Sequence, residues 1–213
     1  MSDSVKRPYR AAKRAESAAA TRAAIRRAAT ELFIENGYAA TPLRAVAKRA
    51  GVGERTLYDS FPGKLELFRH TLDVAIVGDE EPIAVADRAE VLDALADPDP
   101  HAAVGRLVEY TAELFERAGD LIMVGVDAEA ADPQLRAWGD AGAEATRAFW
   151  LTCTRALADQ GNLRAGVDAE TAADVLFAMA SPHVFRLLRR RRGWTAAHYG
   201  QWLRDSATRE LLR

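Results

Sequence analysis

The chain has 213 residues, of which 49% are hydrophobic and 28% charged, a balance that fits a globular protein and excludes a disordered one. Its length can hold one large or two small domains. The single cysteine, Cys153, excludes an internal disulfide framework and suits a reducing compartment. Because no apolar run approaches the ~20 residues of a membrane span and the N-terminus lacks the apolar core of a signal peptide, we expect a cytoplasmic protein with no membrane partner.

The charge is distributed unevenly along the chain. Residues 1–64 carry 13 Lys and Arg against 6 Asp and Glu, whereas the rest carries 16 against 25. A basic N-terminal third on an acidic body is typical of a protein in which only that third meets a polyanion. The charge pattern therefore favours a nucleic-acid contact in the first third of the chain.

Residues 1–16 are polar and basic and contain few large apolar groups. One interpretation is a solvated, flexible tail. The other is an arm that adds phosphate or minor-groove contacts beside a DNA-binding domain. The sequence leaves both open. The basic residues of this arm are Lys6, Arg7, Arg10, Lys13 and Arg14.

Helical spacing of apolar residues predicts a first helix from about Ser17 to Asn36, which Gly37 ends. Thr41 and Pro42 then start a second helix, with Thr41 as the N-cap and Pro42 at the first helical position. The Thr41 hydroxyl could equally hold a phosphate at that helix end. The apolar stripe of the first helix is Ile25, Ala28, Ala29, Leu32 and Phe33.

The stretch from Thr41 to Phe68 reads as two short helices joined by a tight turn over residues 50–53. Gly51 lies where the first of these helices must end in a left-handed residue, a conformation that glycine adopts at low cost. Two helices joined in this way form a helix-turn-helix, whose second helix presents its outer face. The residues that hold the two helices together are Val46, Ala47, Ala50, Val52, Leu57 and Phe61.

The run A-G-V-x-x-x-T-L-Y-x-x-F-x-x-K-x-x-L, from Ala50 to Leu67, resembles the DNA-binding signature of the TetR family of transcriptional regulators. The resemblance extends upstream and covers roughly residues 18–70. It implies a three-helix DNA-binding domain over residues 17–77, after the arm of residues 1–16. It also implies a helical domain over residues 78–213 that binds an effector and dimerises.

The outer face of the second helix carries side chains suited to reading or gripping DNA. Arg44 by resemblance reaches a guanine edge or a phosphate. Tyr58 and Lys64 match family positions that touch backbone phosphates. Base contacts are expected from the N-terminal end of this second helix, the recognition helix. The alternative for Glu54 is a structural role, because the helix dipole favours a negative charge at that position. The DNA-binding candidates are Thr41, Arg44, Glu54, Arg55, Thr56, Tyr58, Ser60 and Lys64.

The rest of the chain shows helical patterns and no alternating, strand-like runs, so we predict an all-α fold with about nine helices. Further helices are expected at about residues 64–77, 83–96, 100–118, 121–131, 133–159 and 168–190, with a last one after Thr195. Pro182 should kink the penultimate helix. The four arginines of residues 189–192 are expected to be a solvated helix end, with a second DNA contact as the alternative.

The C-terminal half resembles that of many TetR-family regulators more loosely. This resemblance implies that the last two long helices pair with their symmetry mates in a homodimer, which would present two recognition helices to a palindromic site. The expected interface residues are Val184, Phe185, Leu188, Tyr199, Trp202 and Leu203.

Family members commonly bind a small, largely apolar effector inside the helical body, so a pocket of apolar residues is expected there. Each candidate could instead belong to the core. The candidates are Tyr110, Phe115, Met123, Trp138, Phe149, Phe177 and Met179.

No residue constellation supports an enzyme, a metal site or a cofactor, since the four histidines lack ligand spacing. The sequence thus predicts a regulator that binds double-stranded DNA, a repressor released by an unknown small molecule. Within the same class it could be an activator or answer to a protein partner. A helical ligand carrier without specific DNA binding is the alternative from another class.

Overall fold

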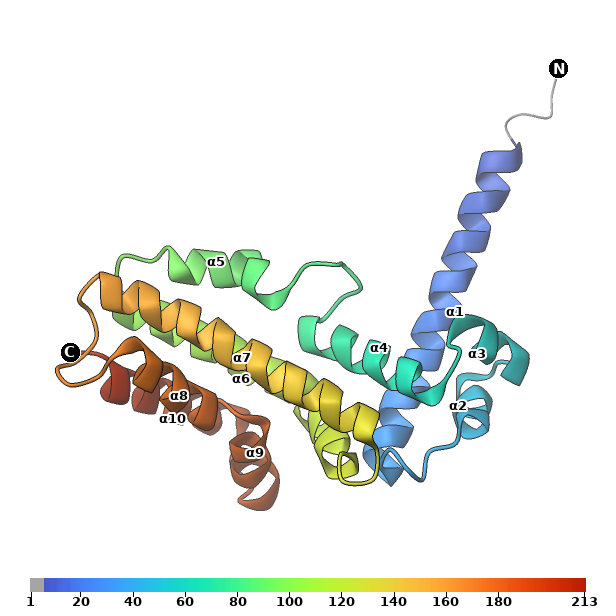
Figure 1. Ribbon diagram of the computed structural model, residues 1–213. Coiled ribbons are helices and arrows are strands. Elements are labelled where there is room, and N and C mark those ends of the chain that lie inside the picture. The colour runs from blue at the N-terminus through green and yellow to red at the C-terminus, as the bar shows by residue number, and fades with distance from the viewer. Residues whose placement is uncertain (1–5) are drawn as a thin grey trace. The chain divides into compact units, whose positions relative to one another are not determined.

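The computed structural model describes the backbone of residues 6–213, together with the side chains of Lys13 and of residues 16–213. This part of the chain is helical throughout, which confirms the all-α prediction (Figure 1). It forms two compact units, divided between Asp73 and Val74. Unit 1 holds α1 (Lys6–Asn36), α2 (Leu43–Ala50), α3 (Glu54–Ser60) and most of α4 (Lys64–Val77).

Unit 2 consists of the end of α4 and the helices that follow it. A 3₁₀ turn, η1 (Val85–Asp87), leads into α5 (Ala89–Leu95) and the two long helices α6 (Pro100–Ala128) and α7 (Pro133–Asp159). The chain continues through α8 (Ala169–Met179), α9 (Pro182–Phe185), a π-helical segment η2 (Arg186–Arg191) and α10 (Ala196–Leu211). No helix within residues 6–213 combines the length and apolar character that crossing a bilayer would need.

Helix α1 starts earlier than the sequence predicted. It begins at Lys6 rather than near Ser17, so residues 6–16 of the expected flexible arm are helical, while residues 1–5 lie outside the described residues. The segment is rich in alanine, arginine and lysine, which are strong helix formers. Its proline stands in the first turn, where a missing N–H costs little.

Helix α6 is continuous where two helices were expected. The predicted break between residues 118 and 121 is wrong, because Gly119 stays helical and its missing side chain makes room for the Phe185 ring. A Cβ atom at Gly119 would lie 2.7 Å from the nearest ring carbon. The close approach of α6 and α9 therefore depends on this glycine.

The core of unit 1 joins the apolar faces of its four helices. The Phe33 and Phe68 rings meet edge to face with centroids 5.1 Å apart, and Tyr38 packs against both. The turn before α3 contains Gly51 with φ of 70°, as expected for the end of α2. The buried side chains that hold the helices together are Ile25, Leu32, Val46, Ala47, Leu57, Phe61 and Leu67.

A basic cluster from α1 covers the end of α3. Arg22 Nη1 donates a hydrogen bond to the Ser60 carbonyl oxygen at 3.1 Å, and its guanidinium lies 4.7 Å from the centroid of the Phe61 ring. The His70 ring lies 5.3 Å from Phe61, and its buried Nε2 has no hydrogen-bond partner. Burial lowers the pKa of His70, and the charges of Arg22 and Arg26 lower it further.

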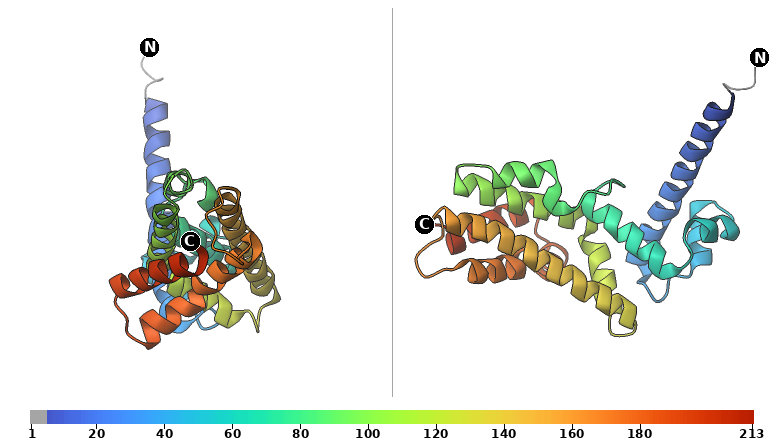
Figure 2. Two further views of the ribbon diagram at one scale, coloured as in Figure 1. Left: turned by 90° about the vertical axis from the view of Figure 1, so that its left-hand side faces the viewer. Right: turned by 45° about the horizontal axis from the view of Figure 1, so that its top comes forward.

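Unit 2 is organised around α6. In Figures 1 and 2, α6 and α7 run side by side, and the contacts of α5, α9 and α10 are mainly with α6, whereas α8 packs on α7. In the core the Phe185 ring contacts the Phe115 ring at a tilt and the Tyr199 ring edge to face. Asp99, Asp132, Asp168, Ser181 and Thr195 each accept a backbone N–H at a helix start, so these five helices are capped by side chains.

The arginine run is partly an internal contact. Arg189 and Arg190 pair with Glu116 and Asp120 of α6, and Arg186 pairs with Asp127 at 2.7 Å. Within the run of residues 189–192, Arg189 is half-buried and departs from the expected solvated helix end, whereas Arg190, Arg191 and Arg192 are exposed as expected. Exposed ion pairs are individually worth little, but several in a row fix the orientation of η2 against α6.

Replacing Gly119 with alanine should destabilise unit 2. The added methyl group would force Phe185 to move, at a cost of about 1–3 kcal/mol in the free energy of unfolding. Urea unfolding followed by tryptophan fluorescence measures this cost in unit 2, since all four tryptophans lie beyond residue 137. Gly142→Ala in α7 is the control, where a Cβ meets nothing within 4 Å and should stabilise by about 0.5–1 kcal/mol. Equal effects of both substitutions would contradict the close packing at Gly119.

Stability should fall in mildly acidic solution because of His70. Its pKa is lowered in the folded chain, so as the pH falls through the unfolded value of 6.5 the unfolded chain takes up a proton first. The folded state thus loses stability below that pH. Urea unfolding followed by circular dichroism at about pH 7 and pH 5 should show a smaller loss in His70→Gln than in the wild type. His101→Gln, on an exposed side chain, should behave like the wild type.

Candidate nucleic-acid interface

Helix α3 presents one polar face to solvent and buries the opposite face. Leu57 is fully buried and Phe61, just after the helix, nearly so. On the other face the Arg55 side chain is 95% exposed and Tyr58 is 51% exposed. Glu54 and Thr56 are exposed with them, so the side chains predicted to read bases lie on one accessible surface.

The arginines near this surface differ in how they are held. Arg49 is fixed by Glu31 and Glu35 at 2.9 and 3.1 Å, and hydrogen bonds to these two carboxylates raise its pKa. Arg55 has only a long contact with Asp59 at 4.0 Å. Arg44 is exposed on α2. Arg44 and Arg55 are therefore the guanidinium groups available for bidentate recognition of a guanine edge or a phosphate.

Lys64 is anchored within unit 1. Its Nζ donates to the Ala39 carbonyl oxygen at 3.1 Å and lies 4.5 Å from the centroid of the Tyr38 ring. The ammonium thus ties the start of α4 to the segment between α1 and α2.

Thr41 does not take either of its expected roles. The N-cap of α2 is Pro42, with no side-chain cap, and Thr41 is 1% exposed. Its hydroxyl lies 3.0 Å from the Leu32 carbonyl oxygen and 2.8 Å from that of Gly37, both at the end of α1. The side chain satisfies orphan carbonyls of α1 and is not accessible to a phosphate.

Ser60 is half-buried, and its hydroxyl is engaged within α3 itself. Its hydroxyl donates to the Thr56 carbonyl oxygen at 2.9 Å, while its own carbonyl accepts from Arg22. Sequence reasoning missed Arg22, which supports the C-terminal end of the recognition helix. Its distance of 38 residues from Ser60 leaves no local signal, and only its place on the polar side of the first helix could have suggested a tertiary role.

The residues expected to line an effector pocket do not surround one opening. Phe115 and Met123 are buried in the core of unit 2, and Trp138 is half-buried on α7. The remaining four are partly buried side chains packed against the main core: Tyr110, Phe149, Phe177 and Met179.

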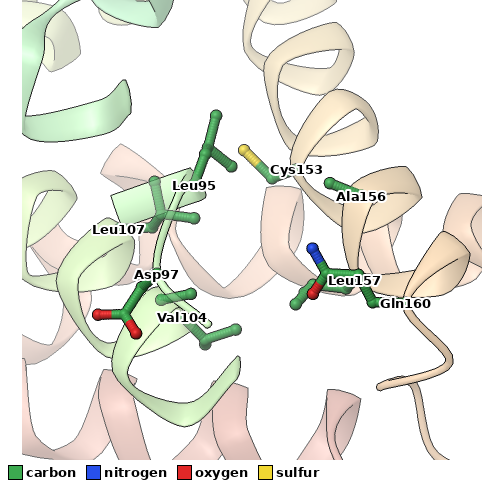
Figure 3. A pocket seen from close by; sticks show the side chains of 9 residues that line it. Leu95, Asp97, Val104, Leu107, Cys153, Ala156, Leu157 and Gln160 are labelled. Atoms are coloured by element: carbon green, nitrogen blue, oxygen red, sulfur yellow. The ribbon is translucent and has the colours of Figure 1, made fainter. Parts of the chain in front are cut away.

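The pocket in Figure 3 lies at a different place. It lies between the loop after α5, the start of α6 and the end of α7, and Cys153 and Leu157 form one side of it. Its volume is about 10 Å³, which is room for about one water molecule. Burial raises the pKa of the Cys153 thiol to about 12, so this cysteine is a packed, unreactive one.

Half of the expected dimer residues are core residues. Phe185, Tyr199 and Leu203 are fully buried within the single chain, so they are not on a surface that a second chain could touch. Helical spacing of an apolar side chain indicates that the side chain is buried, but not whether its own chain or a second chain covers it. Val184, Leu188 and Trp202 are partly exposed, and Leu187 beside them is 50% exposed.

Comparison with known proteins gives a family model that matches part of the chain and solved structures that share its fold. Residues 25–71 match the family model of bacterial regulatory proteins, tetR family. The match spans the second half of α1, all of α2 and α3, and most of α4. A search of curated proteins gave no match.

Solved structures match nearly the whole chain. SmeT in its triclosan complex is 23% identical, with a TM-score of 0.71 and coverage of 91% of this chain and 92% of SmeT. NalD from Pseudomonas aeruginosa, the secondary repressor of the MexAB-OprM multidrug efflux pump, is 21% identical, with a TM-score of 0.68 and coverage of 93% and 98%. The MbdR regulator from Azoarcus sp. CIB is 18% identical, with a TM-score of 0.69 and coverage of 91% and 100%.

At these identities the structural neighbours establish the fold, whereas the family model covers the helix-turn-helix itself. The two findings agree with the exposed polar face of α3. Residues 25–71 therefore contain a helix-turn-helix of the type found in bacterial regulatory proteins of the tetR family, and the chain as a whole has the fold of the solved regulators named above.

Proposed function

We propose that this regulator is a homodimeric repressor that binds a palindromic operator in double-stranded DNA and leaves it when a small, largely apolar molecule binds unit 2. The exposed polar face of α3 is the observation that carries the proposal. That face lies in the basic third of the chain, and such a surface suits the major groove. A protein of this kind works where the DNA is, in the cytoplasm.

The exposed side chains divide into two roles. Base edges are read by three accessible side chains, Arg44, Arg55 and Thr56. The guanidinium donors of the two arginines match the edge of guanine, and the threonine hydroxyl can bond to donors or acceptors of any base. Tyr58 and Lys64 hold backbone phosphates and supply affinity that is independent of sequence. Glu54 stands at the first position of α3, where the helix dipole stabilises its negative charge, and its carboxylate could accept a hydrogen bond from cytosine.

Dimerisation would use the partly exposed apolar side chains near the end of the chain. Leu187 and Leu188 in η2 and Trp202 in α10 supply such a surface, with Val184 beside them. A two-fold axis between these helices would place two copies of α3 on the two half-sites of a palindrome.

Release by a ligand would act through the packing of unit 2. A molecule that inserts among its helices binds best to a conformation in which they have moved, and such coupling is typically worth about 1–3 kcal/mol. Two structural neighbours support the form of this proposal: NalD is a repressor and SmeT forms a complex with triclosan.

The decisive experiment is selection of bound sequences from random double-stranded DNA by the purified protein. The expected product is an inverted repeat, whose half-site and spacing the selection yields together. A mobility-shift titration of that sequence at several salt concentrations should show affinity that falls steeply with salt. Recovery of unrelated sequences with no repeat would contradict operator binding.

Arg55→Ala should weaken binding to the selected operator by about 1–3 kcal/mol, roughly 5- to 150-fold, because a guanidinium that reads a base edge is lost. Binding to unrelated DNA should change little. The matched control is Arg136→Ala, an exposed arginine on α7, which should leave operator affinity unchanged. Equal losses on operator and unrelated DNA would instead assign Arg55 to the phosphate backbone.

A further inference from the structure

Arg22 of α1 holds the C-terminal end of the recognition helix α3. Its Nη1 donates to the Ser60 carbonyl oxygen at 3.1 Å, and the guanidinium lies 4.7 Å from the centroid of the Phe61 ring. Ser60 is the last residue of α3, so its carbonyl oxygen has no partner within the helix, and a cation at this end interacts favourably with the helix dipole. Because α3 has only seven residues, loss of this contact would loosen a large part of the helix.

His70 contacts the same Phe61 ring. Its imidazole lies 5.3 Å from the Phe61 centroid, so the imidazole and the Arg22 guanidinium are at most about 10 Å apart. Phe61 is 3% exposed, and the Nε2 atom of His70 is buried without a hydrogen-bond partner. The separation does not exceed the Debye length, which is about 10 Å at ~0.1 M salt, so a charge on His70 would act on Arg22.

The groups around His70 do not compensate a positive charge. Burial lowers the pKa of His70, and the charges of Arg22 and Arg26 on α1 lower it further. Phe61, which joins α3 to α4, is apolar. Among residues 16–213, no carboxylate forms an ion pair with His70 or Arg22, and the two acidic residues within a turn of His70 on α4 are exposed. The charged residues of α4 within that turn are Glu66, Arg69 and Asp73.

Protonation of His70 is therefore unfavourable as long as Arg22 keeps its place. A protonated imidazole has an N–H on both ring nitrogens, so it puts a donor at Nε2, where no acceptor lies. It also adds a positive charge near Arg22. Movement of Arg22 away from Phe61 relieves the repulsion and lets water reach the imidazole, but it removes the donor from the Ser60 carbonyl oxygen.

We propose that Arg22 and His70 are positioning residues that make DNA binding sensitive to protons: with His70 neutral, Arg22 holds α3 in the DNA-reading conformation, and with His70 protonated, Arg22 leaves and binding weakens. The inference rests on the proposed binding of DNA by α3. The pKa of His70 is lowered while Arg22 is in place. As the pH falls below the ordinary value of 6.5, the proton is therefore taken up by the displaced conformation, which binds DNA less well.

Operator affinity of the full chain, measured by fluorescence anisotropy in steps from pH 7.5 to pH 5.5 at constant ionic strength, tests the switch. The wild type should bind about threefold or more weakly at pH 5.5, whereas His70→Gln, which has no imidazole to protonate, should change much less. His101→Gln, on an exposed side chain of α6, should lose as much as the wild type. Circular dichroism at each pH verifies that the chain is folded. Equal losses in the wild type and His70→Gln, or no loss in the wild type, would overturn the proposal.

Arg22→Met separates the switch from the loss of a merely structural contact. Methionine retains an unbranched apolar stem beside Phe61 but has neither the charge nor the donor. Operator affinity at pH 7.5 should fall by about threefold or more, and the remaining affinity should vary little with pH, because no guanidinium is left to repel. An undiminished pH dependence in Arg22→Met would contradict the role of Arg22.

The same titrations distinguish the switch from the function on which it rests. If the wild type does not bind an operator at pH 7.5, the proposed function itself fails. If it binds equally well at every pH, DNA binding stands and the switch alone is wrong.

Discussion

The DNA-facing surface of this protein depends on the burial of one side of a very short helix. Helix α3 has seven residues, far fewer than an isolated helix needs to be stable in water. Its conformation therefore comes from Leu57 and Phe61, which pack into unit 1, and from the Arg22 contact at its last carbonyl. The exposed side chains of α3 are therefore positioned by the packing of these three residues.

Much of unit 1 could be predicted from the sequence because its determinants are local. Apolar spacing identified the four helices, and Gly51 identified the turn. The roles of Thr41 and Ser60 could not be predicted in this way, since their hydroxyls bond to carbonyl oxygens of the preceding helical turn or of α1. A polar side chain at a helix boundary has several possible hydrogen-bond partners, and the tertiary structure determines which of them it contacts.

Unit 2 was less predictable, because its organisation rests on contacts between distant segments. Gly119 resembles a helix end in sequence, yet it is the point at which Phe185 approaches α6. Tyr199 was expected at a dimer interface but is fully buried within its own chain. Apolar periodicity shows that a helix face is covered, but not which segment or chain covers it.

The π-helical segment η2 is sensitive to the number of residues that it contains. A π turn is equivalent to an α-helix with one extra residue inserted, so it rotates everything beyond it relative to a regular helix. Arg186, Arg189 and Arg190 share one helix face by their spacing of three and four residues, and all three pair with carboxylates of α6. Loss or gain of a single residue in η2 would change which arginines face the carboxylates, even though the run of arginines would look almost the same. In this segment the number of residues constrains the protein more tightly than their identity does.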